Sequence, residues 1–260
     1  MVLTIAGGAS FAVMAPEKQS RPNFAITPKF KRTQVFSEVK KLAYDDRMAE
    51  GLRERKKRQT RQYISDVATG LFLEKGFDAV TIAEIAAASD VSVNTVYNYF
   101  PAKEDLFFDR SEGVVDRLAR YVRGRDGGES AAAAVLRELR AEVEAVSPRL
   151  GLMEGYDRFM TVVHGAHTLR SRLWYIQQES QANLRQALGE ETGAEDGDDM
   201  PELVAGQICW VHSTLMAWIG REMVKGRAPA EVSREALVLL DDMEGLLSEG
   251  VLNYAVRGDA

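Results

Sequence analysis

The chain has 260 residues, of which 45% are hydrophobic and 28% are charged, and Cys209 is its single cysteine. This composition is typical of a globular protein with a real core, and one cysteine excludes an internal disulfide framework. The formal charge of −6 at pH 7 argues against a protein that is basic throughout, as many nucleic-acid binders are.

The charge is unevenly distributed along the chain. Residues 1–47 hold eight basic and four acidic residues, residues 48–126 hold thirteen of each, and residues 127–260 hold twelve basic and twenty-two acidic residues. The acidic excess therefore lies in the C-terminal half, and the basic run over residues 53–62 can still bind phosphate locally.

The first 47 residues contain three prolines and show no sustained hydrophobic period, so we expect a disordered extension. Their apolar beginning lacks a basic segment and is interrupted by glycines, and we therefore do not expect a signal peptide. The longest apolar stretch, residues 203–220, includes Gln207 and His212. It predicts a buried helix and not a membrane span, and the expected location is the cytoplasm.

Helix signals begin directly after this extension. Residues 53–75 predict a helix, because an apolar stripe runs from Ile64 to Phe72 and Gly76 is a good helix end. Thr81, followed three residues later by Glu84, forms a capping-box pattern that opens a second, short helix through Ala88.

A third helix is predicted between Ser92, which can cap it, and Pro101, which cannot continue it. We expect Val93, Val96 and Phe100 to pack inward. The outer face then carries four residues: Asn94, Thr95, Asn98 and Tyr99. Short polar side chains can enter the major groove of DNA without burying an unpaired charge, and Asn can pair with adenine. Helices arranged in this way predict a helix-turn-helix module.

The remaining sequence predicts helix after helix, with no convincing strand alternation and no internal repeat. The predicted helices span residues 102–125, 129–146, 150–165, 168–188, 201–225 and 230–254. The expected class is therefore all-α, with a helix-turn-helix domain over residues 48–105 and a second, helical domain over residues 106–260, to which the resemblance described below assigns effector binding and dimerisation.

Phosphate contacts are expected around the helix-turn-helix module. Arg58 and Arg61 of the basic run, Lys103, and the helix starts at Thr81 and Ser92 can all reach the DNA backbone. Each feature has an ordinary alternative when taken alone, because basic runs are commonly solvated faces and helix-turn-helix geometry also occurs in proteins that do not bind DNA. Their combination is what indicates DNA binding.

The segment from Arg58 to Asp109 resembles the N-terminal DNA-binding domain of the TetR family of bacterial transcriptional regulators. The resemblance rests on an "LF…KGF" helix end, a "T…EIA" second helix and a "VS…TVY.YF..KE.L" third helix. It implies that the third helix reads bases, that Tyr97 and Lys103 contact phosphates, and that a helical C-terminal domain binds a ligand and dimerises. Tyr97 has a structural alternative, in which its ring wedges the third helix against the first.

Two apolar faces on the last two helices predict a homodimer interface. One stripe of the helix over residues 201–225 runs from Val204 to Ile219, and a second contains Gln207, Trp210, Thr214 and Trp218. Aromatic and polar side chains suggest an effector pocket, although such residues also occur in ordinary cores. The candidates are Tyr156, Phe159, Met160, His164, Trp174, Tyr175, Gln178, Gln207, Trp210 and His212.

Enzyme chemistry is not expected. The sequence has no nucleophile elbow, phosphate loop or dinucleotide fingerprint, and we predict no cofactor. His164 and His167 could bind a metal only with a third ligand, and none stands at a known spacing, so no metal site is predicted. The favoured function is a repressor that a small-molecule effector releases from a palindromic operator. The alternatives are an architectural DNA-binding protein without an effector and a helical enzyme.

Overall fold

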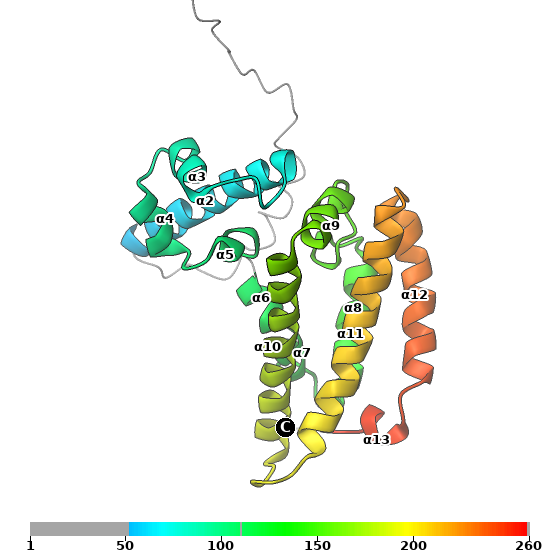
Figure 1. Ribbon diagram of the computed structural model, residues 1–260. Helices are drawn as coiled ribbons and strands as arrows, with labels where there is room; N and C mark the ends of the chain where they lie inside the picture. The colour runs from blue at the N-terminus through cyan, green and yellow to red at the C-terminus, as the bar shows by residue number, and fades with distance from the viewer. Residues whose placement is uncertain (1–51, 110, 259–260) are drawn as a thin grey trace, which may run out of the picture. The chain divides into compact units, whose positions relative to one another are not determined.

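The computed structural model describes residues 52–109 and 111–258 of the chain (Figure 1). Within these ranges the chain forms helices joined by turns and contains no strand, which confirms the predicted all-α class. The expected extension over residues 1–47 lies outside the described residues.

The first two described helices begin and end where the sequence predicts. α2 (Leu52–Lys75) stops at Gly76, whose φ of +87° is a left-handed conformation that glycine adopts without steric cost. α3 (Ile82–Ala88) opens with the predicted capping box. The Thr81 N–H donates to Glu84 Oε2 at 2.8 Å, and the Glu84 N–H donates to Thr81 Oγ1 at 3.2 Å.

The third helix of the module is α4 (Val93–Tyr99), and Ser92 caps its N-terminus as predicted. The turn from α3 to α4 passes through Asp90, which has a φ of +54°. Asp tolerates this left-handed conformation better than most residues do. The turn allows the Val91 N–H to donate to the Ala86 carbonyl at 3.0 Å, which closes the helix-turn-helix corner.

The single fourth helix predicted over residues 102–125 is wrong. Three short helices replace it: α5 (Lys103–Phe107), α6 (Ser111–Val115) and α7 (Arg117–Arg123). α5 ends where Phe107 is almost fully buried and Phe108 packs beside it, with ring centroids 5.3 Å apart. Tertiary packing of these two aromatic side chains overrides the helical periodicity of the segment.

The rest of the chain forms a helical bundle. Its elements are α8 (Ala131–Glu144), the 3₁₀ turn η1 (Pro148–Leu150), α9 (Tyr156–Gly165), α10 (His167–Thr192), α11 (Met200–Val224), α12 (Pro229–Gly245) and α13 (Glu249–Leu252). The helix predicted over residues 150–165 begins only at Tyr156, because Gly151 and Gly155 both have a φ of +82°. α10 in turn extends to Thr192, four residues beyond the predicted end of its helix at residue 188.

The predicted last helix over residues 230–254 is also interrupted. α12 ends at Gly245, and Ser248 caps the separate α13. Between them Leu247 turns inward and is only 8% exposed, whereas Leu246 points to solvent. Burial of one leucine at a non-helical position therefore breaks the pattern.

Buried side chains form two hydrophobic clusters. The C-terminal core joins apolar side chains of α7, α8, α10, α11 and α12. The N-terminal core consists of Ile64, Ala68, Phe72, Phe77, Val80, Ile85, Ala86, Val96, Phe100, Leu106, Phe107, Val163, Ala166 and Leu169. The last three of these residues belong to α9, α10 and the turn between them, so the helix-turn-helix module does not close its core alone.

α11 has the length and hydropathy of a possible membrane span, with a mean hydropathy of 1.2 over its most apolar window. Its predicted stripe, however, lies inside the bundle, since Val204, Ile208 and Leu215 are at most 2% exposed. It packs against α10, α12 and α9. This is the environment of a core helix, as the sequence predicts.

Two aromatic residues of α9 connect the two cores. Phe159 stacks on Phe107 of the N-terminal core, with ring centroids 4.5 Å apart, and on Tyr156, at 5.9 Å. Tyr156 packs against the C-terminal core. Its ring lies so close to Gly151 that a Cβ at that position would stand 2.5 Å away, and the glycine is therefore required there. We call Phe107, Phe159 and Tyr156 the aromatic joint.

A buried arginine holds the C-terminal segment against the bundle. The Arg125 side chain is 1% exposed, donates from Nε to the Ala255 carbonyl at 3.1 Å, and lies 2.9 Å from Glu191. We expect Arg125→Met to lower the free energy of unfolding by about 3 kcal/mol, because it removes a buried guanidinium together with its hydrogen bond to the Ala255 carbonyl and its ion pair with Glu191. Arg185→Ala, at a half-exposed ion pair, should change it by less than about 1 kcal/mol. Urea unfolding of both variants tests this, and equal effects would contradict it.

Candidate functional site

α4 is fixed to the N-terminal core by its inner side. Val96 and Phe100 are at most 1% exposed and pack among the buried residues of α2 and α3. The predicted inward position of Val93 is wrong, because this side chain is 40% exposed. With only two anchors on a helix of two turns, most of the α4 surface faces solvent.

The outward side of α4 presents Val93, Asn94, Tyr97 and Asn98, which we call the recognition face. Asn94 and Asn98 are exposed, and Tyr97 is half exposed. Asn94, Tyr97 and Asn98 follow the i, i+3, i+4 spacing of one helix face. The face therefore offers two carboxamides, one phenol and one small apolar group, and no charge.

Thr95 and Tyr99, which the sequence places on the outer face, are both partly buried. The Thr95 N–H donates to Ser92 Oγ at 3.0 Å, and the two hydroxyl oxygens lie 2.8 Å apart. The Tyr99 ring packs against the N-terminal core. Ser92 and Thr95 thus cap the helix, and Tyr99 contributes to its anchoring.

Arg61 ties three segments together behind α4. Its Nε donates to Asp109 Oδ1 at 2.5 Å, its Nη1 donates to the Tyr99 carbonyl at 2.7 Å, and its guanidinium lies 4.6 Å from the centre of the Phe100 ring. The Tyr99 carbonyl belongs to the last turn of α4, where helix carbonyls lack partners within the helix. Arg61 therefore positions the C-terminal end of α4.

Lys103 plays a similar part at the other side of the module. Its Nζ donates to the Phe77 carbonyl at 2.5 Å and lies 4.3 Å from the centre of the Phe77 ring. Burial lowers the pKa of this lysine below its ordinary value. The Lys103 ammonium group therefore fixes the loop between α2 and α3. The phosphate contact predicted for this residue would be a second role.

The other predicted phosphate contacts lie at the surface. Thr81 is exposed at the start of α3, but the Glu84 carboxylate already accepts its N–H. Arg58 is partly buried, and Arg55, Lys56 and Lys57 of the basic run are exposed. The densest group of exposed basic side chains in the module therefore lies in the N-terminal part of α2, before the apolar residues that this helix buries.

The predicted effector residues do not come together in one pocket. Tyr156 and Phe159 belong to the aromatic joint, and burial raises the pKa of Tyr156 to about 12. Five others are exposed on α9, α10 and α11: His164, Trp174, Gln178, Gln207 and Trp210. The sequence pattern indicates which helices carry aromatic and polar residues of the kind that line ligand pockets. It does not indicate which face of each helix packs against the rest of the protein.

A buried polar cluster in the C-terminal core was not predicted as a unit. Arg117 of α7 is 6% exposed, and its Nη1 lies 3.8 Å from Glu142 Oε2 of α8. Tyr121 Oη donates to Glu142 Oε1 at 3.0 Å, and Arg149 Nη1 lies 3.6 Å from the same carboxylate oxygen. His212 of α11 is partly buried, with its Nε2 atom inside, and burial, followed by the charge of Arg117, lowers its pKa to about 4.

The sequence did contain a signal for part of this cluster. Glu142 lies three residues after Leu139 and seven after Val135, both fully buried, so it occupies the apolar face of α8. A carboxylate at such a position requires a buried partner. The same reasoning applies to Arg61, which stands three residues before the buried Ile64 on α2.

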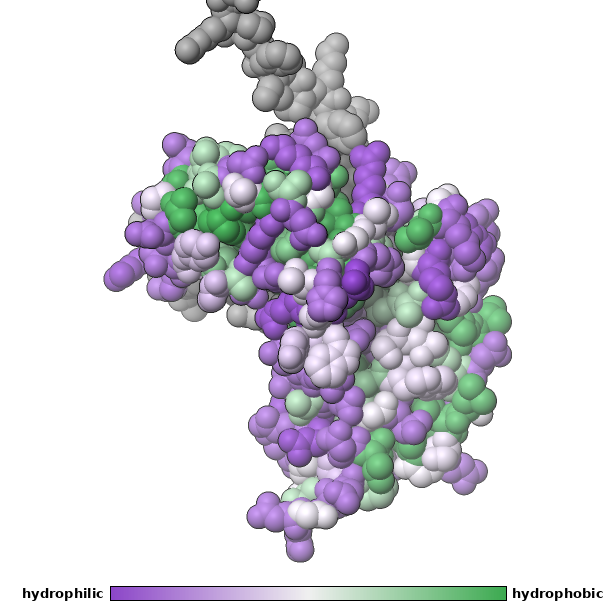
Figure 2. Space-filling view, in the orientation of Figure 1, coloured by the Kyte–Doolittle hydropathy of each residue, from purple (hydrophilic) through white to green (hydrophobic). Residues whose placement is uncertain are grey.

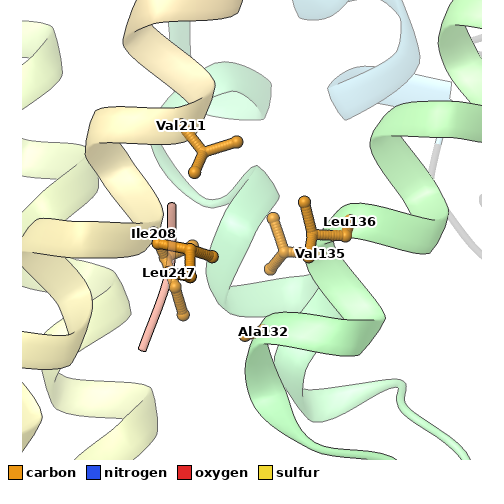
Figure 3. Close-up of a pocket in the computed structure, with 6 residues that line it drawn as sticks. All are labelled: Ala132, Val135, Leu136, Ile208, Val211 and Leu247. Atoms are coloured by element: carbon orange, nitrogen blue, oxygen red, sulfur yellow. The ribbon is translucent and has the colours of Figure 1, made fainter. Parts of the chain in front are cut away.

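A narrow apolar gap separates α8 from α11 in the same core (Figure 3). Ala132, Val135 and Leu136 line it from α8, Ile208 and Val211 line it from α11, and Leu247 closes it. The side chains in Figure 3 point toward one another across the gap, which is too narrow to hold a water molecule. This gap is therefore closed in the structure.

Comparison with known proteins identifies the N-terminal module. Residues 64–109 match the model of the family described as bacterial regulatory proteins, tetR family. The chain is 27% identical over 154 residues to the HTH-type transcriptional regulator TcmR of Streptomyces glaucescens, which covers 57% of this chain and 67% of TcmR. It is 34% identical over 88 residues to the regulator AcrR of Shigella flexneri, which covers 33% of this chain and 40% of AcrR.

A structural neighbour is NalD, described as the secondary repressor of the MexAB-OprM multidrug efflux pump in Pseudomonas aeruginosa. The two chains are 21% identical, with a TM-score of 0.45 over 73% of this chain and 97% of NalD. The match to AcrR spans less than half of that protein's own length.

The buried histidine makes stability depend on pH. Because the folded pKa of His212 is about 4 and its ordinary value is 6.5, the unfolded chain binds more protons between these values, and stability is lost as the pH falls from 6.5 toward 4. His212→Phe removes this loss, which amounts to at most about 1.4 kcal/mol per pH unit. Urea unfolding should show that the free energy of unfolding decreases less between pH 7 and pH 5 in His212→Phe than in the unsubstituted protein. An equal decrease in the two proteins would contradict the assignment of this pH dependence to His212.

Proposed function

We propose a repressor function for this chain, which belongs to the tetR family of bacterial regulatory proteins and is a DNA-binding transcriptional regulator. It binds as a homodimer to a palindromic operator in the cytoplasm, and a small-molecule effector releases it. The recognition face of α4 is the observation that carries this proposal, because a short helix with an uncharged polar outer face and buried anchors suits the major groove.

Base reading is assigned to the two carboxamides. Asn94 and Asn98 are exposed, one helical turn apart, and each can form a bidentate pair with an adenine edge. Val93 beside them offers an apolar contact to a thymine methyl group. Tyr97, half exposed on the same face, can donate its hydroxyl to a phosphate oxygen.

Backbone contacts come from the edges of the module. Arg58, Arg61 and Lys103 supply positive charge, and Thr81 and Ser92 stand at helix starts where phosphate oxygens are favoured. Thr95 and Tyr99 support the face more than they extend it, since both are partly buried. Arg61 and Lys103 thus combine phosphate attraction with fixing the position of α4.

Dimerisation is assigned to α11 and α12. Part of the second stripe of α11 remains uncovered within one chain, since Trp210 is 39% exposed, whereas Trp218 packs against the C-terminal core. Leu203 of α11 and Val238 of α12 are each 61% exposed. Figure 2 shows hydrophobic and weakly polar side chains interspersed over these helices. Pairing with a second copy would bury them in a four-helix interface and create the twofold symmetry of a palindromic operator.

Release by an effector requires that the two cores communicate. The aromatic joint supplies a route, because Phe159 packs on the N-terminal core and Tyr156, three residues earlier on α9, packs on the C-terminal core. A ligand that shifts α9 would change the position of the recognition face. Only a ligand with different affinities for the two arrangements can release DNA in this way.

The alternatives are less favoured. An architectural DNA-binding protein would gain little from two exposed carboxamides on a recognition helix, because backbone charge alone supplies its affinity. A helical enzyme is less favoured because the similar proteins are described as transcriptional regulators.

The division between base and backbone contacts can be tested by selecting random duplexes with the protein and its variants. Asn94→Ala and Asn98→Ala should each change the selected bases at one position per half-site and cost about 1–3 kcal/mol on the original motif. Lys103→Met should weaken binding to all duplexes and reduce the salt dependence, because it removes one phosphate contact. Unchanged motifs in both Asn variants, or no motif for the parent protein, would contradict the proposal.

The interface can be tested by sedimentation of single-residue variants. Trp210→Arg and Val238→Arg should convert the dimer into a monomer, because each buries an unpaired charge in an apolar interface. Trp174→Arg is the matched control, since this tryptophan is also exposed, at 54%, but lies on α10. A dimer that survives both interface substitutions, or that is lost only in the control, would place the interface elsewhere.

A further inference from the structure

The turn between α4 and α5 fixes the C-terminal end of the recognition helix. It spans residues 100–102, between Tyr99, the last residue of α4, and Lys103, the first residue of α5. Asp105 Oδ2 accepts the Ala102 N–H at 3.0 Å, and Ala102 has no side chain that could cap α5. A backbone N–H at the start of a helix needs such an acceptor. The Asp105 carboxylate therefore holds this turn in one conformation.

An arginine of the C-terminal bundle contacts this carboxylate. α5 lies beside the N-terminal end of α10 (Figure 1), and Arg172 Nε of α10 is 3.4 Å from Asp105 Oδ1. Leu169 and Leu173 of the same helix are buried in the N-terminal core or pack against it. The i, i+3, i+4 spacing of these three α10 residues places them on one side of the helix. Arg172 therefore faces the helix-turn-helix module.

Stability does not explain an arginine at this position. Its neighbours on this side of α10 are leucines, so an apolar side chain would continue the buried face. The side chains of Arg172 and Asp105 are 32% and 23% exposed, and solvent screens such a pair, so it contributes little to folding. Arg172 Nε is also buried without a hydrogen-bond partner, which lowers the stability of the folded chain. A role in function accounts for this arginine better than a role in folding.

We propose that Arg172 is a positioning residue for base recognition. It holds Asp105, and Asp105 holds the turn after α4, so the recognition face is fixed relative to the C-terminal bundle by a charge that touches no DNA. This inference rests on the proposed function and adds a polar contact to the aromatic joint.

A positioning residue and a phosphate contact have different effects on DNA binding. Loss of a phosphate contact weakens binding to every duplex and reduces the salt dependence. Loss of a positioning residue weakens binding only where bases are read, because a smaller fraction of the protein holds α4 in the arrangement that fits the groove. The ratio of specific to non-specific affinity is therefore the quantity that identifies the role of Arg172.

This ratio is measured with the full chain at several salt concentrations, on the duplex obtained by selection and on a scrambled duplex of the same length and composition. Arg172→Met should lower the specific affinity about fivefold for each half-site, and so about 25-fold for a dimer, because a partly exposed ion pair is lost in each module. The non-specific affinity and the salt dependence should stay unchanged.

Arg185→Met is the matched control, because it removes one positive charge from an exposed ion pair on the same helix. It should change neither affinity by more than about twofold. Equal losses of Arg172→Met on the two duplexes, a reduced salt dependence, or the same loss in the control would overturn the proposal.

Asp105→Asn tests the partner of Arg172. Its carboxamide oxygen can still accept the Ala102 N–H, but it carries no charge for the arginine. We expect the loss seen in Arg172→Met, and no further loss when the two substitutions are combined. Glu179→Gln removes the same charge from a second carboxylate near Arg172, at 3.9 Å, and should leave the ratio unchanged. Losses that add in the double variant would mean that the two residues act independently and would overturn the assignment.

Thermal unfolding separates positioning from folding. The unfolding temperature of Arg172→Met should stay close to that of the parent protein, and a large decrease would indicate a structural role and overturn the proposal. A selected motif in the parent protein together with an unchanged ratio in Arg172→Met would reject this inference and leave the regulator function intact. Selection of no motif by the parent protein would reject the regulator function and this inference with it.

Discussion

The stack of Phe107 on Phe159 is the contact on which the other features of this protein depend. The helix-turn-helix module does not complete its own core, because Val163 and Leu169 of the neighbouring helices are buried in it. Phe159 also stacks on Tyr156, which packs against the C-terminal core. The position of the recognition face consequently depends on α9, the helix whose Tyr156 also packs against the C-terminal core. Under the proposed function, a ligand that shifts α9 would change DNA binding without any contact to α4.

The inner side of the short α4 anchors the helix to the N-terminal core, and its outer side presents polar residues to solvent. Val96 and Phe100 fix its inner side, and Arg61 binds the carbonyl of its last residue. This arrangement fixes the backbone that carries the exposed Asn94 and Asn98. In the proposed complex, less backbone freedom would therefore be lost when DNA binds. The cations that a DNA-binding surface needs are thereby also structural. Substitutions at Arg61 will affect stability and affinity together.

Local signals predicted the module well, because capping and glycine stops act over a few residues. The starts at Thr81 and Ser92 and the stop at Gly76 are all found where the sequence places them. Features that depend on distant partners were not predictable in the same way. The break after Phe107 depends on Phe159, fifty-two positions away in the chain. The effector candidates were chosen by residue type, whereas the buried cluster depends on which faces of α7, α8 and α11 meet.

We propose that the aromatic joint and a homodimer hold two recognition faces at one fixed separation, close to the roughly 34–36 Å between successive major grooves. The most direct measurement is the affinity of the dimer for its selected operator before and after insertion of five base pairs between the half-sites. A fixed separation predicts that the insertion, which turns one half-site to the opposite side of the duplex, reduces the affinity to that of a single half-site. Unchanged affinity would mean that the two modules move independently, and it would contradict the role assigned to the joint.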